Sequence, residues 1–246
     1  MLVRLLAYGW DEGPLPYLVL EYADLGSLRE FLQANLQSWE EKNRLAVGLA
    51  SALEMLHACE VIHGDIKLEN ILAFSSSKRG FDAKLADFGL SCFTALGSRD
   101  FRGTHLVSAP EVRTGKAPIG DIVAYEKADV YSYGMAMWEV MDDGGRYYHS
   151  PSICKTATED EIEFARDFLA QLDSREAKIT PYAAEFIRNL DMPTYMRNRM
   201  VSALEMALVR DPEDRCDIRE FRLELDISEE YVCPRYRVLM PLLSNS

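Results

Sequence analysis

The chain has 246 residues, with 27 lysine and arginine against 40 aspartate and glutamate side chains, so its formal net charge is −13 at pH 7. This acidic balance argues against a broad nucleic-acid surface and against adhesion to anionic lipid, since both need clustered basic side chains. Hydrophobic residues make up 48% of the chain, an ordinary globular mixture, and no apolar run reaches the length of a membrane span. We expect a folded protein without nucleic-acid or membrane partners.

The first 23 residues predict a β-hairpin. An apolar run from Leu2 to Tyr8 is followed by the turn-forming residues 11–14, and a second apolar run covers residues 17–20. Apolar runs of this length, separated by Gly and Pro, are typical of two adjacent strands.

Helical patterns begin directly afterwards. Ser27 and Ser38 each stand three residues before a Glu, the spacing of a capping box in which the Ser oxygen accepts a backbone N–H and the Glu reaches back. The second helix carries leucines that share one face. These are Leu45, Leu49, Leu53 and Leu56. Short strands are then expected at residues 61–62, 71–74 and 83–86.

The second half of the chain predicts mainly helices. Apolar residues at helical spacing mark an amphipathic helix across residues 130–141, and Thr158 opens a third capping box before a helix that ends near residue 172. Pro181 suits the first turn of a further helix, where its missing N–H is harmless. Helices are also expected at 195–209 and 217–225. Strands followed by helices indicate an α+β fold, a small sheet attached to a larger helical body.

The five cysteines indicate a reducing compartment. They are Cys59, Cys92, Cys154, Cys216 and Cys233. They are scattered, odd in number and without a C-x-x-C pair, so neither a disulfide framework nor a zinc site is expected. No signal-peptide pattern opens the chain. We therefore expect an intracellular protein of the cytoplasm or nucleus.

The chemically informative stretch is the ten residues His-Gly-Asp-Ile-Lys-Leu-Glu-Asn-Ile-Leu at 63–72. Asp-Phe-Gly follows at 87–89, Gly-Thr at 103–104 and Ala-Pro-Glu at 109–111. In this order and spacing, the motifs resemble those of the protein kinase family, namely the catalytic loop H-R-D-L-x-x-x-N followed by D-F-G and A-P-E.

The resemblance extends over most of residues 2–225. Residues 18–22 look like the strand and hinge that hold adenine, and residues 129–134 look like the start of the central buried helix of the large lobe. Arg215 resembles the arginine that pairs with the Glu of A-P-E, here Glu111. The implied fold is protein kinase-like, with a truncated small β lobe followed by a mainly α-helical large lobe. Its parts would be a small-lobe remnant and hinge at 1–23, the large lobe at 24–227 and a C-terminal tail at 228–246.

The resemblance implies phosphoryl transfer from ATP with Mg²⁺. Asp65 would accept the proton of the substrate hydroxyl, and Lys67 would place a charge near the γ-phosphate. Asn70 and Asp87 would supply oxygen ligands to Mg²⁺. Thr104 would steady Asp65 and Lys67. These residues form the implied catalytic and metal-binding set.

The same resemblance implies the nucleotide contacts. Leu20 would be the gatekeeper, backbone atoms near Glu21 and Ala23 would bond adenine, Ser27 would lie near the ribose, and Leu72 would form an apolar floor. The Asp-x-Lys spelling and the Gly-Thr before A-P-E are similar to serine/threonine kinases. The implied partner is a protein substrate with a Ser or Thr hydroxyl.

Departures from the family pattern leave two alternatives open. Residue 64 is Gly where most kinases have an Arg that docks a phosphorylated loop, so loop phosphorylation is expected to matter less here. His-Gly-Asp is also the spelling in small-molecule phosphotransferases, which typically lack the Lys, D-F-G and A-P-E found here. A small-molecule phosphotransferase is therefore the less favoured of the two alternatives to a protein kinase.

The more favoured alternative comes from the start of the chain, which resembles the fourth strand of the family's small lobe. The Gly-rich loop, the Lys strand and the Glu helix that precede this strand in the family do not occur in the sequence. We therefore expect this chain alone to transfer phosphate slowly or not at all. The alternative is a pseudokinase that acts as a binding or scaffold module.

Overall fold

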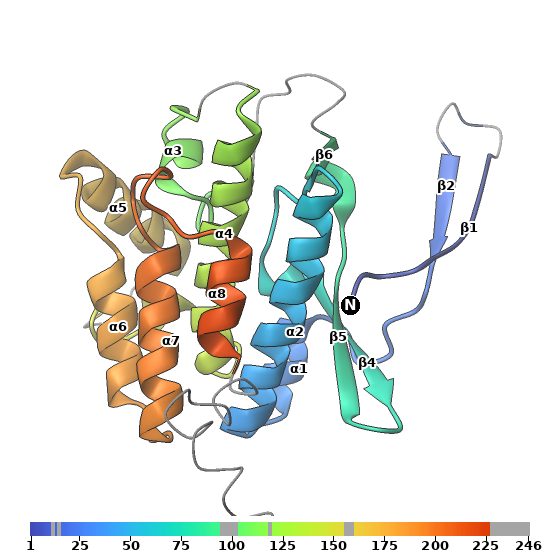
Figure 1. Ribbon diagram of the computed structural model, residues 1–246, viewed down its shortest axis with the longest axis horizontal. Coiled ribbons are helices and arrows are strands. Elements are labelled where there is room, and N and C mark those ends of the chain that lie inside the picture. The colour runs from blue at the N-terminus through green and yellow to red at the C-terminus, as the bar shows by residue number, and fades with distance from the viewer. Residues whose placement is uncertain (11–12, 14–15, 94–102, 118–119, 155–159, 227–246) are drawn as a thin grey trace, which may run out of the picture.

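The computed structural model describes residues 1–10, 13, 16–93, 103–117, 120–154 and 160–226. Within them, the short strands and two helices lie in the first 93 residues, and helices form the rest, as Figure 1 shows. The predicted α+β arrangement is therefore confirmed. The tail at 228–246 and Thr158 lie outside the described residues.

The predicted hairpin is formed by β1 (Leu5–Trp10) and β2 (Pro16–Leu20), which pair antiparallel with Leu5 opposite Leu20. It stands apart from the helical body in Figure 1, and every side chain of the two strands is exposed apart from the half-buried Gly9. The prediction that the first strand begins at Leu2 was wrong. Leu2 forms a parallel bridge with Leu85 instead, so the apolar run is divided between two sheets.

Two further pairs of strands surround the informative loops. β4 (Ile71–Ser76) pairs antiparallel with β5 (Gly80–Leu85), and β3 (Val61–Ile62) pairs with β6 (Cys92–Phe93). The chain segment 63–70 runs between β3 and β4, and the segment 86–91 runs between β5 and β6. Because β3 pairs with β6 and β4 with β5, the two connecting segments are brought side by side.

The first two helices begin at the predicted serines. α1 (Leu28–Ala34) has a complete capping box, because Ser27 and Glu30 each accept from the other's backbone N–H. α2 (Trp39–Ala58) has half of one. Ser38 accepts from the Glu41 N–H, but the Glu41 carboxylate binds Arg44 at 2.8 Å instead of reaching back.

The core is centred on α4 (Ile122–Met141), against which α2 and α7 (Thr194–Ala207) pack. The prediction of an amphipathic helix was wrong. From Ala128 to Met141 every side chain is buried apart from the half-buried Ser132, because helices surround α4. At Gly134 a Cβ atom would lie 3.0 Å from the Ala207 Cβ, so the glycine permits the close approach of α4 and α7.

The remaining helices include three that were predicted and a short one at 110–113 that the sequence did not predict. They are α3 (Pro110–Arg113), α5 (Glu161–Ser174), α6 (Thr180–Asn189) and α8 (Ile218–Leu225), with 3-10 turns η1 (Leu68–Asn70), η2 (Phe88–Leu90) and η4 (Tyr147–His149). The N-cap of α5 is Asp160, which accepts from the Glu163 N–H. Among the helices of the described ranges, none is long and apolar enough to cross a membrane.

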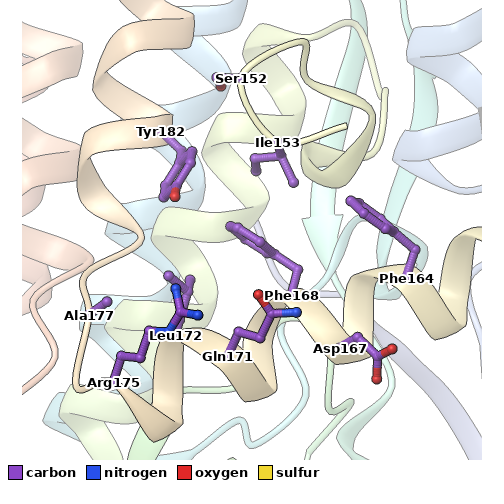
Figure 2. Close-up of a pocket in the computed structure, with 10 residues that line it drawn as sticks. All are labelled: Ser152, Ile153, Phe164, Asp167, Phe168, Gln171, Leu172, Arg175, Ala177 and Tyr182. Atoms are coloured by element: carbon purple, nitrogen blue, oxygen red, sulfur yellow. The ribbon is translucent and has the colours of Figure 1, made fainter. Parts of the chain in front are cut away.

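A cavity of about 430 Å³ lies beside α5 and α6. Figure 2 shows the side chains that line it. Phe164 and Phe168 of α5 and Tyr182 of α6 line it together with Ile153. None of its lining residues belongs to the site that the sequence predicts, so this cavity is separate from the predicted phosphotransfer chemistry.

Candidate active site

The loop 63–70 is held to the central helix by its backbone. Asp129 of α4 is buried, and its two carboxylate oxygens accept from the backbone N–H groups of His63 at 2.7 Å and Gly64 at 2.9 Å. Gly64 has a φ of +82°, a conformation that residues with a Cβ rarely adopt. The glycine thus allows the turn that presents Asp65.

Three of the predicted site residues are bonded to Asp65. Lys67 Nζ lies 2.7 Å from Asp65 Oδ2 and 2.7 Å from Thr104 Oγ1. Thr104 donates its N–H at 2.9 Å and its hydroxyl at 2.6 Å to Asp65 Oδ1. Asn70 Nδ2 donates at 2.8 Å to both the backbone oxygen and Oδ2 of Asp65. The four residues therefore form one connected cluster.

The electrostatics of the cluster keep Asp65 ionised. Burial alone would raise the pKa of Asp65, but the bonds from Lys67 and Thr104 outweigh burial and hold that pKa below its usual value. An ionised carboxylate accepts about four hydrogen bonds. Oδ1 takes two from Thr104, and Oδ2 takes one each from Lys67 and Asn70, so the acceptor capacity of Asp65 is filled.

Asp87 follows Ala86, whose backbone N–H and backbone oxygen are both bonded to the loop 63–70. Ala86 donates its N–H to the Asn70 backbone oxygen at 2.9 Å, and the Ala86 oxygen lies 3.0 Å from His63 Nε2. Asp87 has a φ of +59°, and its exposed side chain accepts from the Gly89 N–H at 3.2 Å. Left-handed backbone at a residue other than glycine is strained, and such strain often marks a functional position.

Asn70 and Asp87 suit a hard cation by the chemistry of their free atoms. Because Asn70 uses its Nδ2 group on Asp65, its amide oxygen remains for a ligand. Asp87 adds an exposed carboxylate. No group of three or more His, Cys, Asp or Glu side chains that could hold a metal occurs within the described ranges. Two protein oxygens match Mg²⁺, which usually takes one or two carboxylates together with substrate phosphates and water.

The residues predicted to contact the nucleotide lie at the end of β2, in the segment before α1 and on β4. Leu20 is exposed at the end of β2, and the carboxylate of Glu21 is bound by Lys84 at 2.6 Å and by Arg4 at 3.1 Å. Ser27 and Leu72 are brought together by a β-bridge, and Ser27 Oγ also donates to Glu30 at 2.8 Å.

These residues are joined to the cluster around Asp65 through β4. This strand begins directly after Asn70 and reaches Leu72 one residue later. The loop before α1 is fastened to the same strand, because Ala73 donates its N–H to the Gly26 oxygen at 2.9 Å. Ala23 lies in the same loop, and its oxygen accepts from the Gly26 N–H at 3.4 Å.

An ion network beside Asn70 was not predicted. Arg29 of α1 binds Glu69 at 2.7 Å and the buried Glu139 of α4 at 2.5 Å, and Arg146 binds Glu69 at 2.7 Å. Burial raises the pKa of Glu139, although Arg29 opposes this. The network holds Glu69, and with it the neighbouring Asn70, against two helices. The partners of Arg29 lie 40 and 110 residues away in sequence, so no local sequence pattern predicts these pairs.

The predicted pair of Glu111 and Arg215 is present. The guanidinium of Arg215 donates at 2.8 Å and 3.1 Å to the two carboxylate oxygens of Glu111, and both side chains are buried. This bidentate pair joins the start of α3 to the segment before α8.

Comparisons with known proteins agree with the family resemblance of the sequence motifs. A family model described as "Protein kinase domain" matches residues 2–222. A leaf rust 10 disease-resistance locus receptor-like protein kinase-like 1.3 from Arabidopsis thaliana is 30% identical over 231 residues, which cover 86% of this chain and 32% of that protein.

Two further relatives match shorter parts of the chain. The probable serine/threonine-protein kinase PBL4 from Arabidopsis thaliana is 37% identical over 149 residues, covering 57% of this chain and 34% of that protein. A putative mitogen-activated protein kinase kinase kinase 7-like protein from Drosophila melanogaster is 34% identical over 145 residues, covering 56% of this chain and 34% of that protein.

The matches cover between 9% and 34% of the length of these and similar curated relatives. The family model nevertheless covers nearly all of the described residues, and the three motifs fall within it in the family's order. The chain therefore belongs to the eukaryotic-type protein kinase family.

Proposed function

We propose that this chain is the catalytic part of a serine/threonine protein kinase, which transfers the γ-phosphate of ATP to a Ser or Thr hydroxyl of a protein substrate. The observation that carries the proposal is the convergence of Lys67, Asn70 and Thr104 on Asp65. Phosphoryl transfer depends on positioning and on electrostatic stabilisation. A carboxylate held by three side chains supplies the first, and an adjacent lysine contributes to the second.

Asp65 would orient the attacking hydroxyl and accept its proton. Its low pKa keeps it ionised and ready to accept at neutral pH. Because its acceptor sites are filled, the hydroxyl can bind only when one donor turns away. Lys67 is the donor best able to do so, since its flexible cationic side chain is also attracted to phosphate. Asn70 and Thr104 would then keep the carboxylate in place.

Asn70 and Asp87 would hold Mg²⁺ through the amide oxygen and the carboxylate. Bound Mg²⁺ would neutralise charge on the phosphates. The adenine would lie at Leu20, Glu21 and Ala23, where backbone groups follow the end of β2. Leu72 would form the floor beneath it, and Ser27 would lie near the ribose; both positions come from the family resemblance.

The substrate class and the cellular compartment belong to the same proposal. Lys67 two residues after Asp65 and Thr104 before A-P-E favour a Ser or Thr acceptor, in line with relatives named serine/threonine kinases. The formal charge of −13 makes nucleic acid and anionic lipid poor partners. Cys59 is a free, exposed thiol and Cys216 a free, buried one, which suits a reducing intracellular compartment.

The test is phosphate transfer by the purified chain to a generic Ser/Thr peptide with Mg²⁺ and ATP. Asp65→Asn should lower the rate by about 100-fold or more, since a positioned base contributes at least that much. The variant should still bind nucleotide, which is measured as a thermal shift with Mg-ATP. Equal transfer by wild type and Asp65→Asn would overturn the role of Asp65. Nucleotide binding without transfer by the wild type would favour a binding module.

A further inference from the structure

Arg113, at the end of α3, connects the candidate site to α5. Its side chain is buried, and its Nε and Nη2 atoms bind the two carboxylate oxygens of Asp173 at 3.1 Å and 3.0 Å. Its remaining nitrogen, Nη1, donates to the backbone oxygen of Ser108. One guanidinium thus joins the last turn of α5 to the segment that follows Thr104. Bidentate arginine–carboxylate pairs fix orientation as well as distance.

Asp173 is itself held from a second direction. Arg210 donates to its carboxylate at 3.3 Å and to its backbone oxygen at 3.2 Å. Arg113 also lies over the ring of Tyr131 of α4, with its guanidinium carbon 5.9 Å from the ring centroid. Burial would lower the pKa of Arg113, but Tyr131 and Asp173 outweigh burial and raise that pKa, so the cation is retained.

Ser108 carries this restraint to Thr104. The Ser108 hydroxyl donates to the Thr104 backbone oxygen at 2.8 Å, and the Ser108 N–H donates to the same oxygen at 3.1 Å. On the other side, a Cβ on Gly103 would lie 2.8 Å from the Gly64 oxygen. The turn 103–108 is therefore confined between the loop that carries Asp65 and the guanidinium of Arg113.

We propose that Asp173 is a positioning residue for phosphate transfer, because it fixes Arg113 and thereby holds Thr104 against Asp65. Thr104 makes two of the four hydrogen bonds to the Asp65 carboxylate. Without Asp173, Arg113 loses both of its bonds to α5 and keeps the Ser108 oxygen and the ring of Tyr131, neither of which ties it to α5. A shift of the turn by about 1 Å would break the bonds from Thr104, and a displacement of that size can lower a rate about 100-fold. The role in catalysis rests on the proposed function.

The test compares Asp173→Asn with wild type by two readouts. One is hydrogen exchange at the Thr104 amide, which donates to Asp65 in the intact cluster. We expect its exchange to accelerate about tenfold in the variant while the amides of α2 are unchanged, because only the local restraint is lost. The other is peptide phosphorylation, in which kcat should fall by about tenfold or more with the KM for ATP unchanged.

The matched control is Glu205→Gln. It removes an exposed ion pair between Glu205 and Arg188 at 3.0 Å, also between two helices of the C-terminal half. Both readouts should match wild type in this control. A folded Asp173→Asn variant with unchanged Thr104 exchange would overturn the proposal. If that variant does not fold, Asp173→Glu takes its place with the same exchange criterion.

The two readouts also separate this proposal from the proposed function. If wild type transfers no phosphate, the proposed function fails, while the Thr104 exchange still decides whether Asp173 positions the turn. If wild type is active and Asp173→Asn alters exchange without lowering kcat, the restraint is real but catalysis does not need it, and the proposal is wrong.

Discussion

The β1–β2 hairpin and the loop 63–70 carry the two parts of the predicted site, and they are held in opposite ways. The hairpin exposes its apolar side chains on both faces, and the carboxylate of Glu21 ties its base to Arg4 and Lys84. The loop is bound by Asp129 and by the ion network at Glu69, and Asp65 is buried. The groups proposed for chemistry are thus bonded to the helical body, while the residues proposed as the hinge follow the exposed hairpin.

The largest expected contrast is in stability, between one tryptophan of each region. Trp138 of α4 is fully buried against the rings of Tyr147 and Phe186, whereas Trp10 of β1 is 63% exposed. Trp138→Ala should lower the free energy of unfolding by about 3–5 kcal/mol because it leaves a cavity. Trp10→Ala should change it by less than about 0.5 kcal/mol, as surface substitutions do. Urea unfolding of both variants measures the difference, and similar losses would mean that the hairpin packs on the body in solution.

The next contrast lies between a buried and an exposed ion pair within the body. Glu111→Gln removes the counter-charge of Arg215, which is 1% exposed. Removal of one partner of a buried pair costs about 3–5 kcal/mol of unfolding free energy. Arg188→Gln breaks the exposed pair with Glu205 and should cost less than about 1 kcal/mol. Thermal unfolding at a common pH is the measurement, and a smaller loss for Glu111→Gln would argue that water reaches Arg215.

The two regions also differ in how well the sequence predicts them. The cluster around Asp65 was predictable because Lys67 and Asn70 are close in sequence, and because the family pattern places Thr104 before A-P-E. The boundary of the first strand was not predictable. Leu2 and Leu5 belong to one apolar run, and only the pairing of Leu2 with Leu85 separates them.

Long-range charge contacts escaped prediction for a different reason. Arg113 and Asp173 are 60 residues apart, and no pattern in the segment of either residue indicates the other as its partner. Helical spacing alone likewise did not predict the burial of α4, which only the family resemblance implied, since the number of helices that pack around it depends on the whole fold. Local spacing therefore predicts loops and caps better than it predicts what surrounds them.

A further contrast is in the titration of one carboxylate in each region. Lys67 lowers the pKa of Asp65, and Lys84 lowers that of Glu21, in each case against burial. Because the folded-state pKa of Asp65 is depressed, its contribution to stability is present above pH ~4, the unfolded pKa, and is lost as the pH falls through the folded pKa. Lys67→Met should raise the pKa of Asp65 towards its unfolded value, so that the contribution becomes smaller and its loss is complete at a higher pH.

The matched variant for this titration is Lys84→Met, which should raise the pKa of Glu21 and leave that of Asp65 unchanged. Carboxyl carbon NMR of the two variants resolves each group. A changed pKa of Asp65 in Lys84→Met would show that Glu21 at the hairpin base and the loop 63–70 are electrostatically coupled. The two regions would then not be independent.

The smallest expected effects lie at Ser27, where the two regions meet. Its hydroxyl accepts from the Glu30 N–H and donates its single proton to the Glu30 carboxylate. Only an acceptor site is therefore left, and a ribose hydroxyl could bind Ser27 only as the donor. Ser27→Ala should cost about 1 kcal/mol of unfolding free energy, whereas Ser38→Ala should cost less, since the box of α2 is half formed.

Nucleotide binding then separates the two serines. If ribose donates to Ser27, Ser27→Ala should weaken Mg-ATP binding by about tenfold at most, the loss of roughly one hydrogen bond, and Ser38→Ala should leave it unchanged. Calorimetric titration of both variants with Mg-ATP is the measurement. Equal affinity in both would leave Ser27 a helix cap alone, and the ribose contact inferred from the family would then have to come from another residue of the loop before α1.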